Sequence, residues 1–240
     1  SNYSNRAKTF DIGKGQLLDN HDEWWLNEAI DASVQNLPDT LENTFTAVDL
    51  SGSMDGPING NSEMKRAEIA TLFGAMLMKR NSGVGAFGSD FALVESNPNA
   101  IENTGTLTIA NEIYKLSEKV ANATDGWKAL KWATEHGVEY DRFVMFTDEQ
   151  IWDSSYHGLL SDGHQETVKK WWDEYQNEVN PDAQLYIIDL ASYGDLSMPE
   201  GYNNVHQISG WSSNVVEFID KNEKASDVVS NIEAVGPDTY

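Results

Sequence analysis

Two polar segments, each directly after an apolar stretch, have the residue types of a cation site. The apolar segment 44–48 is followed by Asp-Leu-Ser-Gly-Ser at 49–53, and the apolar segment 143–146 is followed by Thr-Asp at 147–148. Carboxylates, hydroxyls and water are the ligands that a hard cation such as Mg²⁺ prefers. The alternation Asp-x-Ser-x-Ser lets one turning loop direct its oxygens to a single point, and Gly52 permits the tight path. We therefore predict a divalent-cation site that includes both segments.

Helix capping is the simpler interpretation of the same residues, because Ser and Asp are common at helix N-termini. An isolated Asp-x-Ser would fit capping as well as it fits a metal loop. Asp-x-Ser-x-Ser directly after an apolar strand, together with a second strand that ends in Thr-Asp, favours the cation site. In open α/β sheets, ligands bind outside the carboxyl ends of the strands, where the strand order reverses. If the two strands are neighbours at the centre of the sheet, Asp49 and Asp148 face each other there.

The rest of the chain alternates between short apolar segments and longer segments with helical periodicity, which indicates βαβ units. We expect an α/β fold with a doubly wound, mostly parallel central sheet flanked by helices and one short antiparallel edge strand. Strands are expected at 44–48, 84–87, 91–94, 143–146, 185–190 and 205–208, and helices at 21–36, 64–80, 107–120, 126–135, 165–178, 213–222 and 225–234.

The chain is expected to form one domain. A lead-in at 1–20 precedes a single domain at 21–235, which begins with an amphipathic helix, and a tail follows at 236–240. Six tryptophans on the expected helices are predicted to pack in the core: Trp24, Trp25, Trp127, Trp132, Trp171 and Trp172.

The composition limits the possible partners. The 39 acidic residues outnumber the 16 basic ones, which gives a net charge of −23 spread along the whole length. Such a surface repels phosphate backbones, so a sequence-independent grip on nucleic acid through this chain is not expected. The absence of Cys excludes disulfides and Cys-ligated zinc. No apolar run is long enough to span a membrane and no signal peptide is recognisable, so we expect a cytoplasmic protein without membrane contact.

Residues 47–54, Ala-Val-Asp-Leu-Ser-Gly-Ser-Met, resemble the metal-ion-dependent adhesion site of von Willebrand factor A (vWA) domains. Thr124, between two expected helices, matches the threonine of the family's second loop, and Asp148 matches the aspartate of its third. The resemblance implies a site for Mg²⁺, or for Mn²⁺ or Ca²⁺, made by Asp49, Ser51, Ser53, Thr124 and Asp148. The serines and the threonine would coordinate directly, and the aspartates partly through waters. The segment 121–123 departs from the family pattern, since it reads Ala-Asn-Ala where Gly-Gly is expected.

A second resemblance is narrower and points to the C-terminal domain of Ro (TROVE) ribonucleoproteins. It rests on the helix before the first strand, on Ser-Met at 53–54, on Phe-Thr-Asp-Glu at 146–149 and on Val-His-Gln-Ile-Ser-Gly-Trp at 205–211. In that family a ring of helical repeats precedes the vWA domain and binds RNA. Nothing in these 240 residues resembles the ring. The resemblance therefore implies that RNA is bound only through regions outside this chain.

Three classes of function fit a cation at this position. In a binding module, which we expect, the cation bridges the domain to an acidic group on a protein or other ligand. In a Mg²⁺-dependent phosphatase-like hydrolase, Asp49 would attack the phosphoryl group, but that chemistry needs Asp-x-Asp and Ser51 stands at the second position. In a purely structural domain, the cation would only stabilise the loops. We therefore predict that the chain is not an enzyme, and we leave its oligomeric state open.

Overall fold

The computed structural model describes residues 20–235, apart from residues 61, 81, 95–97, 121, 149–166, 192–201, 203 and 211–213. Side chains are described for these residues except 20–24, 98–99 and 226–235. The predicted tail and all of the predicted lead-in but residue 20 lie outside the described residues.

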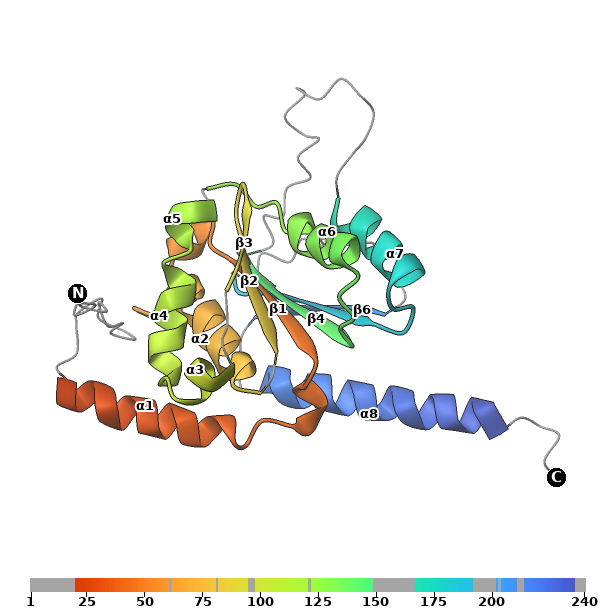
Figure 1. The fold of residues 1–240 in the computed structure, drawn as a ribbon, viewed down its shortest axis with the longest axis horizontal. Helices are drawn as coiled ribbons and strands as arrows, with labels where there is room; N and C mark the ends of the chain where they lie inside the picture. The colour runs from red at the N-terminus through yellow and green to blue at the C-terminus, as the bar shows by residue number, and fades with distance from the viewer. Residues whose placement is uncertain are drawn as a thin grey trace, which may run out of the picture.

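One six-stranded sheet forms the centre of the described chain, in the order β3-β2-β1-β4-β5-β6 (Figure 1). Its strands are β1 (Thr44–Asp49), β2 (Gly83–Phe87), β3 (Phe91–Leu93), β4 (Arg142–Thr147), β5 (Gln184–Asp189) and β6 (Val205–Ser209). All neighbours pair in parallel except β2 and β3, which pair antiparallel. The predicted fold class is confirmed, including the short antiparallel strand at one edge.

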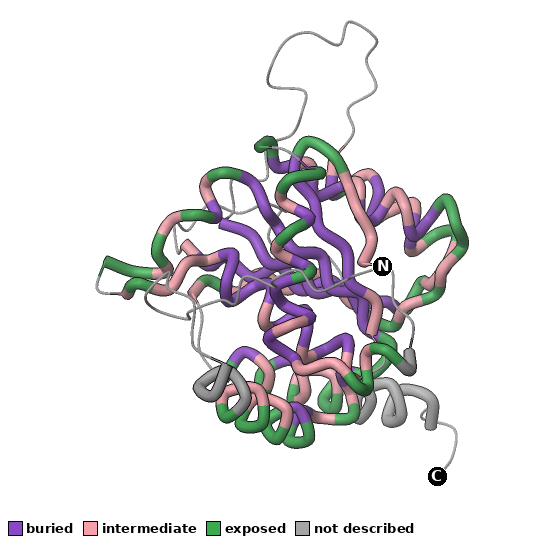
Figure 2. Tube along the Cα trace, turned by 60° about the vertical axis from the view of Figure 1, so that its left-hand side comes forward, coloured by how far each residue is buried: buried purple, intermediate pink, exposed green. Residues whose placement is uncertain are grey.

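The strands are apolar on both faces because helices cover both faces. Side chains alternate across β4, so that Phe143 and Met145 enter one core and Val144 and Phe146 enter the other. Figure 2 shows the strands as the buried centre of the molecule and the exposed residues on the outer helices and loops. Because the side chains alternate strictly, the position of a residue along its strand determines which of the two cores its side chain enters.

The helices divide between the two faces of the sheet (Figure 1). In chain order they are α1 (Asn20–Val34), η1 (Asp39–Leu41), η2 (Gly52–Asp55), α2 (Arg66–Met78), α3 (Pro98–Glu102), α4 (Thr106–Tyr114), α5 (Ser117–Val120), α6 (Trp127–His136), α7 (Val168–Glu178) and α8 (Asn214–Val235). Residues of α1, α2, α4 and α8 share one core, whereas α6 and α7 form the other. No helix in the described ranges is long and apolar enough to cross a membrane.

Helix α1 is attached to the domain through the N-terminus of α4. The backbone N–H of Leu107 donates to Asn27 Oδ1 at 3.0 Å, and the N–H of Thr106 donates to Asp31 Oδ1 at 3.2 Å. These side chains satisfy amides that the residue before α4, Gly105, cannot cap itself. A Cβ at Gly105 would lie only 2.5 Å from Asn27 Oδ1, so the close approach of the two helices requires glycine here.

Two helix predictions need correction. The helix predicted at 107–120 is interrupted after Tyr114, where the N–H of Leu116 bonds to the carbonyl of Ile113 and the chain turns into α5. The carbonyl of Val120 then accepts the N–H of Asp90 at 2.9 Å, which ties the end of α5 to the β2–β3 turn. The helices predicted at 213–222 and 225–234 form one helix, α8, because no Gly or Pro separates them.

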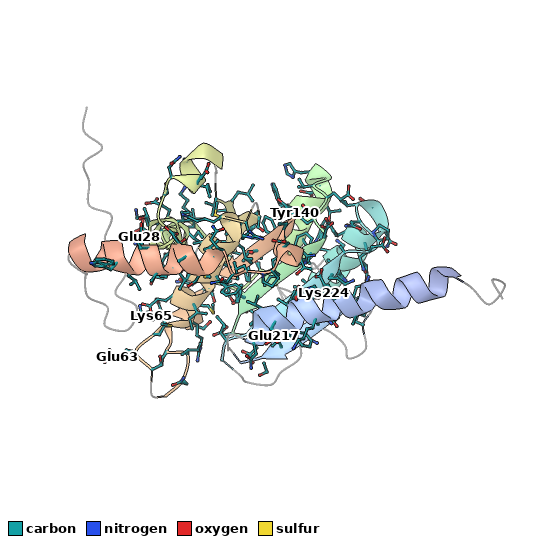
Figure 3. The ribbon with its side chains drawn as sticks, turned by 90° about the horizontal axis from the view of Figure 1, so that it is seen from below. Glu28, Glu63, Lys65, Tyr140, Glu217 and Lys224 are labelled. Carbon is teal, nitrogen blue, oxygen red and sulfur yellow. The ribbon has the colours of Figure 1, made fainter. Side chains whose placement is uncertain are left out.

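The predicted tryptophan core is confirmed in part. Trp127, Trp171 and Trp172 are buried and Trp132 packs partly buried against the same core, but Trp25 is 58% exposed on α1. The side chain of Trp24 lies outside the described residues. Figure 3 shows Glu28 on α1 and Glu217 on α8, both on exposed positions. These helices therefore add to the acidic surface as well as to the core.

Candidate cation site

Two predicted ligands, Asp49 and Asp148, lie where the order of the strands reverses, between β1 and β4. β1 pairs with β2 on one side and with β4 on the other, with Val48 opposite Phe146. Asp49 ends β1 and Asp148 follows β4, so both carboxylates lie at the same carboxyl edge between neighbouring strands. Both residues are fully buried. The adjacency that the predicted site requires is therefore present.

Asp49 is held by hydrogen bonds to both carboxylate oxygens. Its Oδ1 accepts the backbone N–H of Ser51 at 2.8 Å, and its Oδ2 accepts the hydroxyl of Thr147 at 2.8 Å. The pKa of Asp49 is raised to about 7, chiefly by burial and also by the charge of Asp148, while the bonds from Ser51 and Thr147 act to lower it. A carboxylate whose ionised form is disfavoured by burial is one that a nearby cation would stabilise.

The loop after β1 turns so that two hydroxyls lie together. Ser51 precedes η2, and its Oγ lies 3.2 Å from the Oγ of Ser53. Met54 is fully buried and anchors the turn in the core, whereas Gly52 is exposed at its outer side. The local sequence thus places the serine oxygens beside the buried Asp49.

Asp148 is only partly satisfied. Arg66, the first residue of α2, places Nη1 3.4 Å from Asp148 Oδ2 and donates from the same atom to the carbonyl of Ser53 at 3.1 Å. Asp148 Oδ1 is buried and has no hydrogen-bond partner. Arg66 therefore links the first loop to the third, and one carboxylate oxygen keeps its full capacity to bind.

Thr124 lies in a loop that adjoins the first loop. It is buried, and the N–H of the next residue, Asp125, donates to the carbonyl of Gly88 at the end of β2. A Cβ added to Gly52 would lie 3.9 Å from Asn122 Oδ1, so the two loops are in contact. Asn122, two residues before Thr124, thus lies beside the first loop, and the role of Thr124 as a direct ligand stays a prediction.

The donor set is compatible with a hard cation. It combines the partnerless oxygen of Asp148, the second buried carboxylate of Asp49 and the paired hydroxyls of Ser51 and Ser53. Within the described ranges, no group of three or more His, Asp or Glu side chains could hold a metal ion. A cation at this edge would therefore depend on hydroxyl oxygens as well as on the two carboxylates.

Two polar residues near this edge, Arg66 and Asp189, were missed by the prediction. Thr147 belongs to the second predicted segment, although its bond to Asp49 was not foreseen. Asp189 ends β5, is fully buried, and accepts the N–H of Ala191 at 2.7 Å, which repeats the turn that Asp49 makes with Ser51. An apolar strand that ends in Asp was the available signal for Asp189, whereas nothing local marks Arg66.

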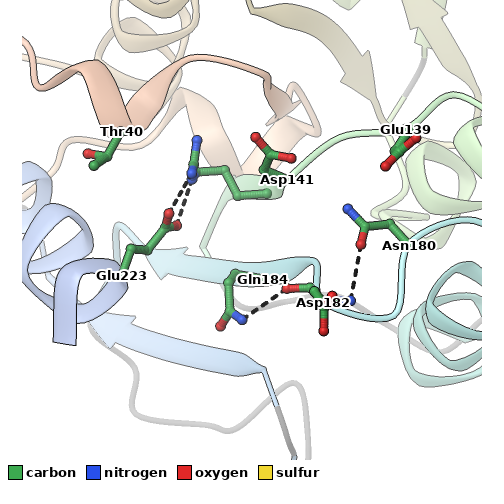
Figure 4. Close-up of a pocket in the computed structure, with 8 residues that line it drawn as sticks. Thr40, Glu139, Asp141, Asn180, Asp182, Gln184 and Glu223 are labelled. Atoms are coloured by element: carbon green, nitrogen blue, oxygen red, sulfur yellow. Dashed lines mark hydrogen bonds and ion pairs between the residues drawn. The ribbon is translucent and has the colours of Figure 1, made fainter. Parts of the chain in front are cut away.

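Two of the pockets formed by the described residues lie at opposite edges of the sheet. A pocket of about 200 Å³ adjoins the first loop and is lined in part by Ser51, Gly52 and Asn122. A pocket of about 460 Å³ lies at the amino edge, where β4 and β5 begin (Figure 4). Its lining is Thr40, Glu139, Asp141, Arg142, Asn180, Asp182, Gln184 and Glu223. Only the smaller pocket includes predicted ligands.

Comparison with known families classifies the chain. A family model described as the Ro60 vWA domain matches residues 43–222. The chain belongs to the Ro60 vWA domain family. The matched range contains all five predicted ligands and all six strands, and α1 precedes it. Both resemblances inferred from the motifs, to vWA domains and to Ro (TROVE) proteins, are thereby confirmed.

A solved structure supports the fold of this Ro60 vWA domain. The crystal structure of the Deinococcus radiodurans RO (RSR) protein matches with a TM-score of 0.61 at 17% identity, covering 86% of this chain and 39% of that chain. A mutant of the PilB minor pilin from Streptococcus sanguinis matches with a TM-score of 0.43 at 12% identity, covering 81% of this chain and 63% of that chain. No curated protein matches the chain. The chain thus spans well under half the length of the RO protein.

Proposed function

We propose that this Ro60 vWA domain is a binding module that depends on a divalent cation, Mg²⁺ or Mn²⁺, at the carboxyl edge of its sheet. The cation would accept an acidic group from a partner. The observation that carries the proposal is the buried, partnerless Oδ1 of Asp148 beside Asp49 and the hydroxyls of Ser51 and Ser53. A buried oxygen of this kind is costly unless it has a partner.

The surroundings favour a cation as the bridge. With a net charge of −23, the domain attracts cations and repels acidic partners unless a cation stands between them. The pocket of about 200 Å³ beside Ser51 and Gly52 gives a partner access to the first loop. An acidic group on a protein is the ligand that this arrangement suits.

We further propose that the domain is part of a longer Ro-type RNA-binding protein. The family match and the RO protein, of which the chain covers 39%, support this assignment. The acidic surface of this chain disfavours contact with phosphate backbones. RNA would therefore be bound by regions outside these 240 residues, and the vWA domain would recruit a protein.

The test is a titration of Mg²⁺ and Mn²⁺ into metal-stripped protein while thermal unfolding is followed. The wild type should gain stability with added cation, because a ligand that binds only the folded state stabilises it. Asp49→Ala should lose the shift. Asp189→Asn is the matched control, since Asp189 is equally buried at the same edge but lies on β5, and it should keep the shift.

Absence of any cation-dependent shift in the wild type would contradict the proposal. Hydrolysis of p-nitrophenyl phosphate that disappears in Asp49→Ala would instead support the phosphatase-like alternative.

A further inference from the structure

We propose that Arg66 is the internal counter-ion of the cation site, competing with the divalent cation for Asp148 and thereby setting the affinity. This inference rests on the proposed function. It concerns a side chain that comes from α2 rather than from any of the three predicted metal loops. Arg66 acts through Asp148 and is therefore a positioning residue.

Helix α2 itself does not favour a positively charged side chain at its first residue, Arg66. Arg66 is the first residue of α2, and the dipole of a helix disfavours positive charge at its N-terminus. The preceding Lys65 is neutralised outside the site, with Nζ 3.0 Å from Asp55 Oδ1. Arg66 instead turns inward, to an ion pair in which its side chain is only 12% exposed and that of Asp148 is fully buried. The position of Arg66 is thus explained by Asp148 and not by α2.

The contact between Arg66 and Asp148 is long enough that a divalent cation could replace it. Nη1 is shared between the Ser53 carbonyl at 3.1 Å and Asp148 Oδ2 at 3.4 Å, whereas a charge-assisted bond is usually about 2.7–2.9 Å long. The second oxygen of Asp148 has no partner. A guanidinium can bind both oxygens of a carboxylate, so this pair uses only part of what Arg66 could offer.

The backbone leaves room for this arrangement. A Cβ at Gly56 would lie 3.1 Å from Nη1 of Arg66 and 3.2 Å from the carbonyl oxygen of Ser53. The N–H of Arg66 also donates to the carbonyl of Gly56 at 3.0 Å. Glycine at this position allows the guanidinium to reach the first loop.

Two positive groups beside one buried carboxylate repel each other strongly, because the surroundings are poorly polarisable. Without a cation, Arg66 compensates Asp148 and holds the first and third loops together. With a cation, Arg66 loses part of that interaction, so binding is weaker than the donor set alone would give. The domain consequently keeps its site formed in both states.

The direct test measures Mn²⁺ affinity from the electron paramagnetic resonance signal of unbound Mn²⁺. Arg66→Gln should bind Mn²⁺ roughly tenfold more tightly than the wild type, since a neighbouring positive charge is removed. Arg66→Lys keeps the charge and should stay close to the wild type. Arg80→Gln is the matched control, because Arg80 follows the other end of α2 and pairs with Asp39, and it should leave the affinity unchanged.

A second readout uses the metal-free protein. Arg66→Gln should lower its melting temperature, because Asp148 is left buried without a counter-ion. Adding Asp148→Asn to Arg66→Gln should restore most of that loss, as expected of two coupled residues. An arginine that did not act on Asp148 would not show this rescue.

The outcomes separate this inference from the proposed function. Weaker or unchanged Mn²⁺ binding by Arg66→Gln overturns the inference, since Arg66 would then orient Asp148 or have no effect on it. Binding by Arg66→Gln but not by the wild type supports the inference and contradicts the proposed function. If neither protein binds Mn²⁺, both are overturned.

Discussion

The two edges of the same sheet each hold an arginine beside a carboxylate, and the pairs differ in how completely they are hydrogen-bonded. At the amino edge, Nε of Arg142 donates to Glu223 of α8 at 2.6 Å and Nη2 donates to the second oxygen of Glu223, the two dashed lines at Glu223 in Figure 4. Nη1 of Arg142 donates to the carbonyl of Glu42 at 2.6 Å. At the carboxyl edge, Arg66 makes one long contact with Asp148. Both arginine side chains are largely buried.

The difference separates a structural pair from an exchangeable one. Arg142 uses its planar fork on both oxygens of Glu223, so neither oxygen is left without a partner and the pair ties α8 to the sheet. Asp148 retains an oxygen with no partner, and the guanidinium of Arg66, which compensates its charge, also donates to the carbonyl of Ser53. Burial of charge therefore does not distinguish the two edges, whereas the partnerless carboxylate oxygen of Asp148 does.

The largest expected effect is on stability at the amino edge. Arg142→Ala should lower the free energy of unfolding by about 5 kcal/mol, the upper end for a broken buried pair, because Glu223 and the Glu42 carbonyl both lose their donors. Urea denaturation measures this loss. Mn²⁺ affinity should not change, and a change in it would show that the two edges are coupled.

A comparable effect at the carboxyl edge depends on pH. The pKa of Asp49 is raised from 3.8 to about 7, so the folded, metal-free protein holds this proton more tightly than the unfolded chain does. The contribution of Asp49 to stability is therefore fully present below about pH 4 and is lost as the pH rises to about 7, by about 4 kcal/mol.

Asp49→Asn should remove this pH dependence. The free energy of unfolding of Asp49→Asn minus that of the metal-free wild type should rise between pH 4 and pH 7 and stay level above. Denaturant titrations at a series of pH values measure the difference. A flat difference would mean that Asp49 is not held in a strained, buried state.

A smaller loss in stability is expected near the amino edge of the sheet, where Tyr140 precedes β4. The hydroxyl of Tyr175 accepts the N–H of Tyr140 at 2.7 Å and donates to the carbonyl of Val138 at 3.0 Å. Tyr175→Phe should cost about 2 kcal/mol in stability, because both backbone groups lose a partner. Thermal unfolding with and without Mn²⁺ should show the same loss, which would confirm that this region does not respond to the cation.

The smallest expected effect comes from a substitution that moves the guanidinium of Arg66 without removing it. Gly56→Ala places a Cβ 3.1 Å from Nη1 of Arg66 and should shift the guanidinium without removing its charge. We expect Mn²⁺ binding to tighten by about twofold to threefold, with a stability change below about 1 kcal/mol. Gly60→Ala is the control, since a Cβ there would meet nothing within 4 Å. Equal Mn²⁺ affinity in both variants would argue against a role for the position of Arg66.

Much of the fold could be predicted because its signals are local. The apolar strands alternate in the pattern that a doubly covered sheet requires, and the helix–strand alternation fixed the fold class. The break after Tyr114 was not predictable, because the turn at Leu116 depends on packing against the β2–β3 region. Trp25 was wrongly placed in the core since helical periodicity alone does not say which residues have a neighbouring layer.

In the candidate site, too, the local contacts could be predicted from the sequence and the long-range contacts could not. The sequence by itself determined the loop from Asp49 to Ser53, because the bond from the Ser51 N–H to Asp49 spans only two residues and needs no other part of the chain. Only the tertiary structure decided what surrounds it. Thr147 reaches Asp49 across 98 positions and Arg66 reaches Asp148 across 82, and such contacts depend on the order of strands in the sheet. That order is a result of packing the whole domain, so no motif could reveal that an arginine lies beside the predicted metal loop.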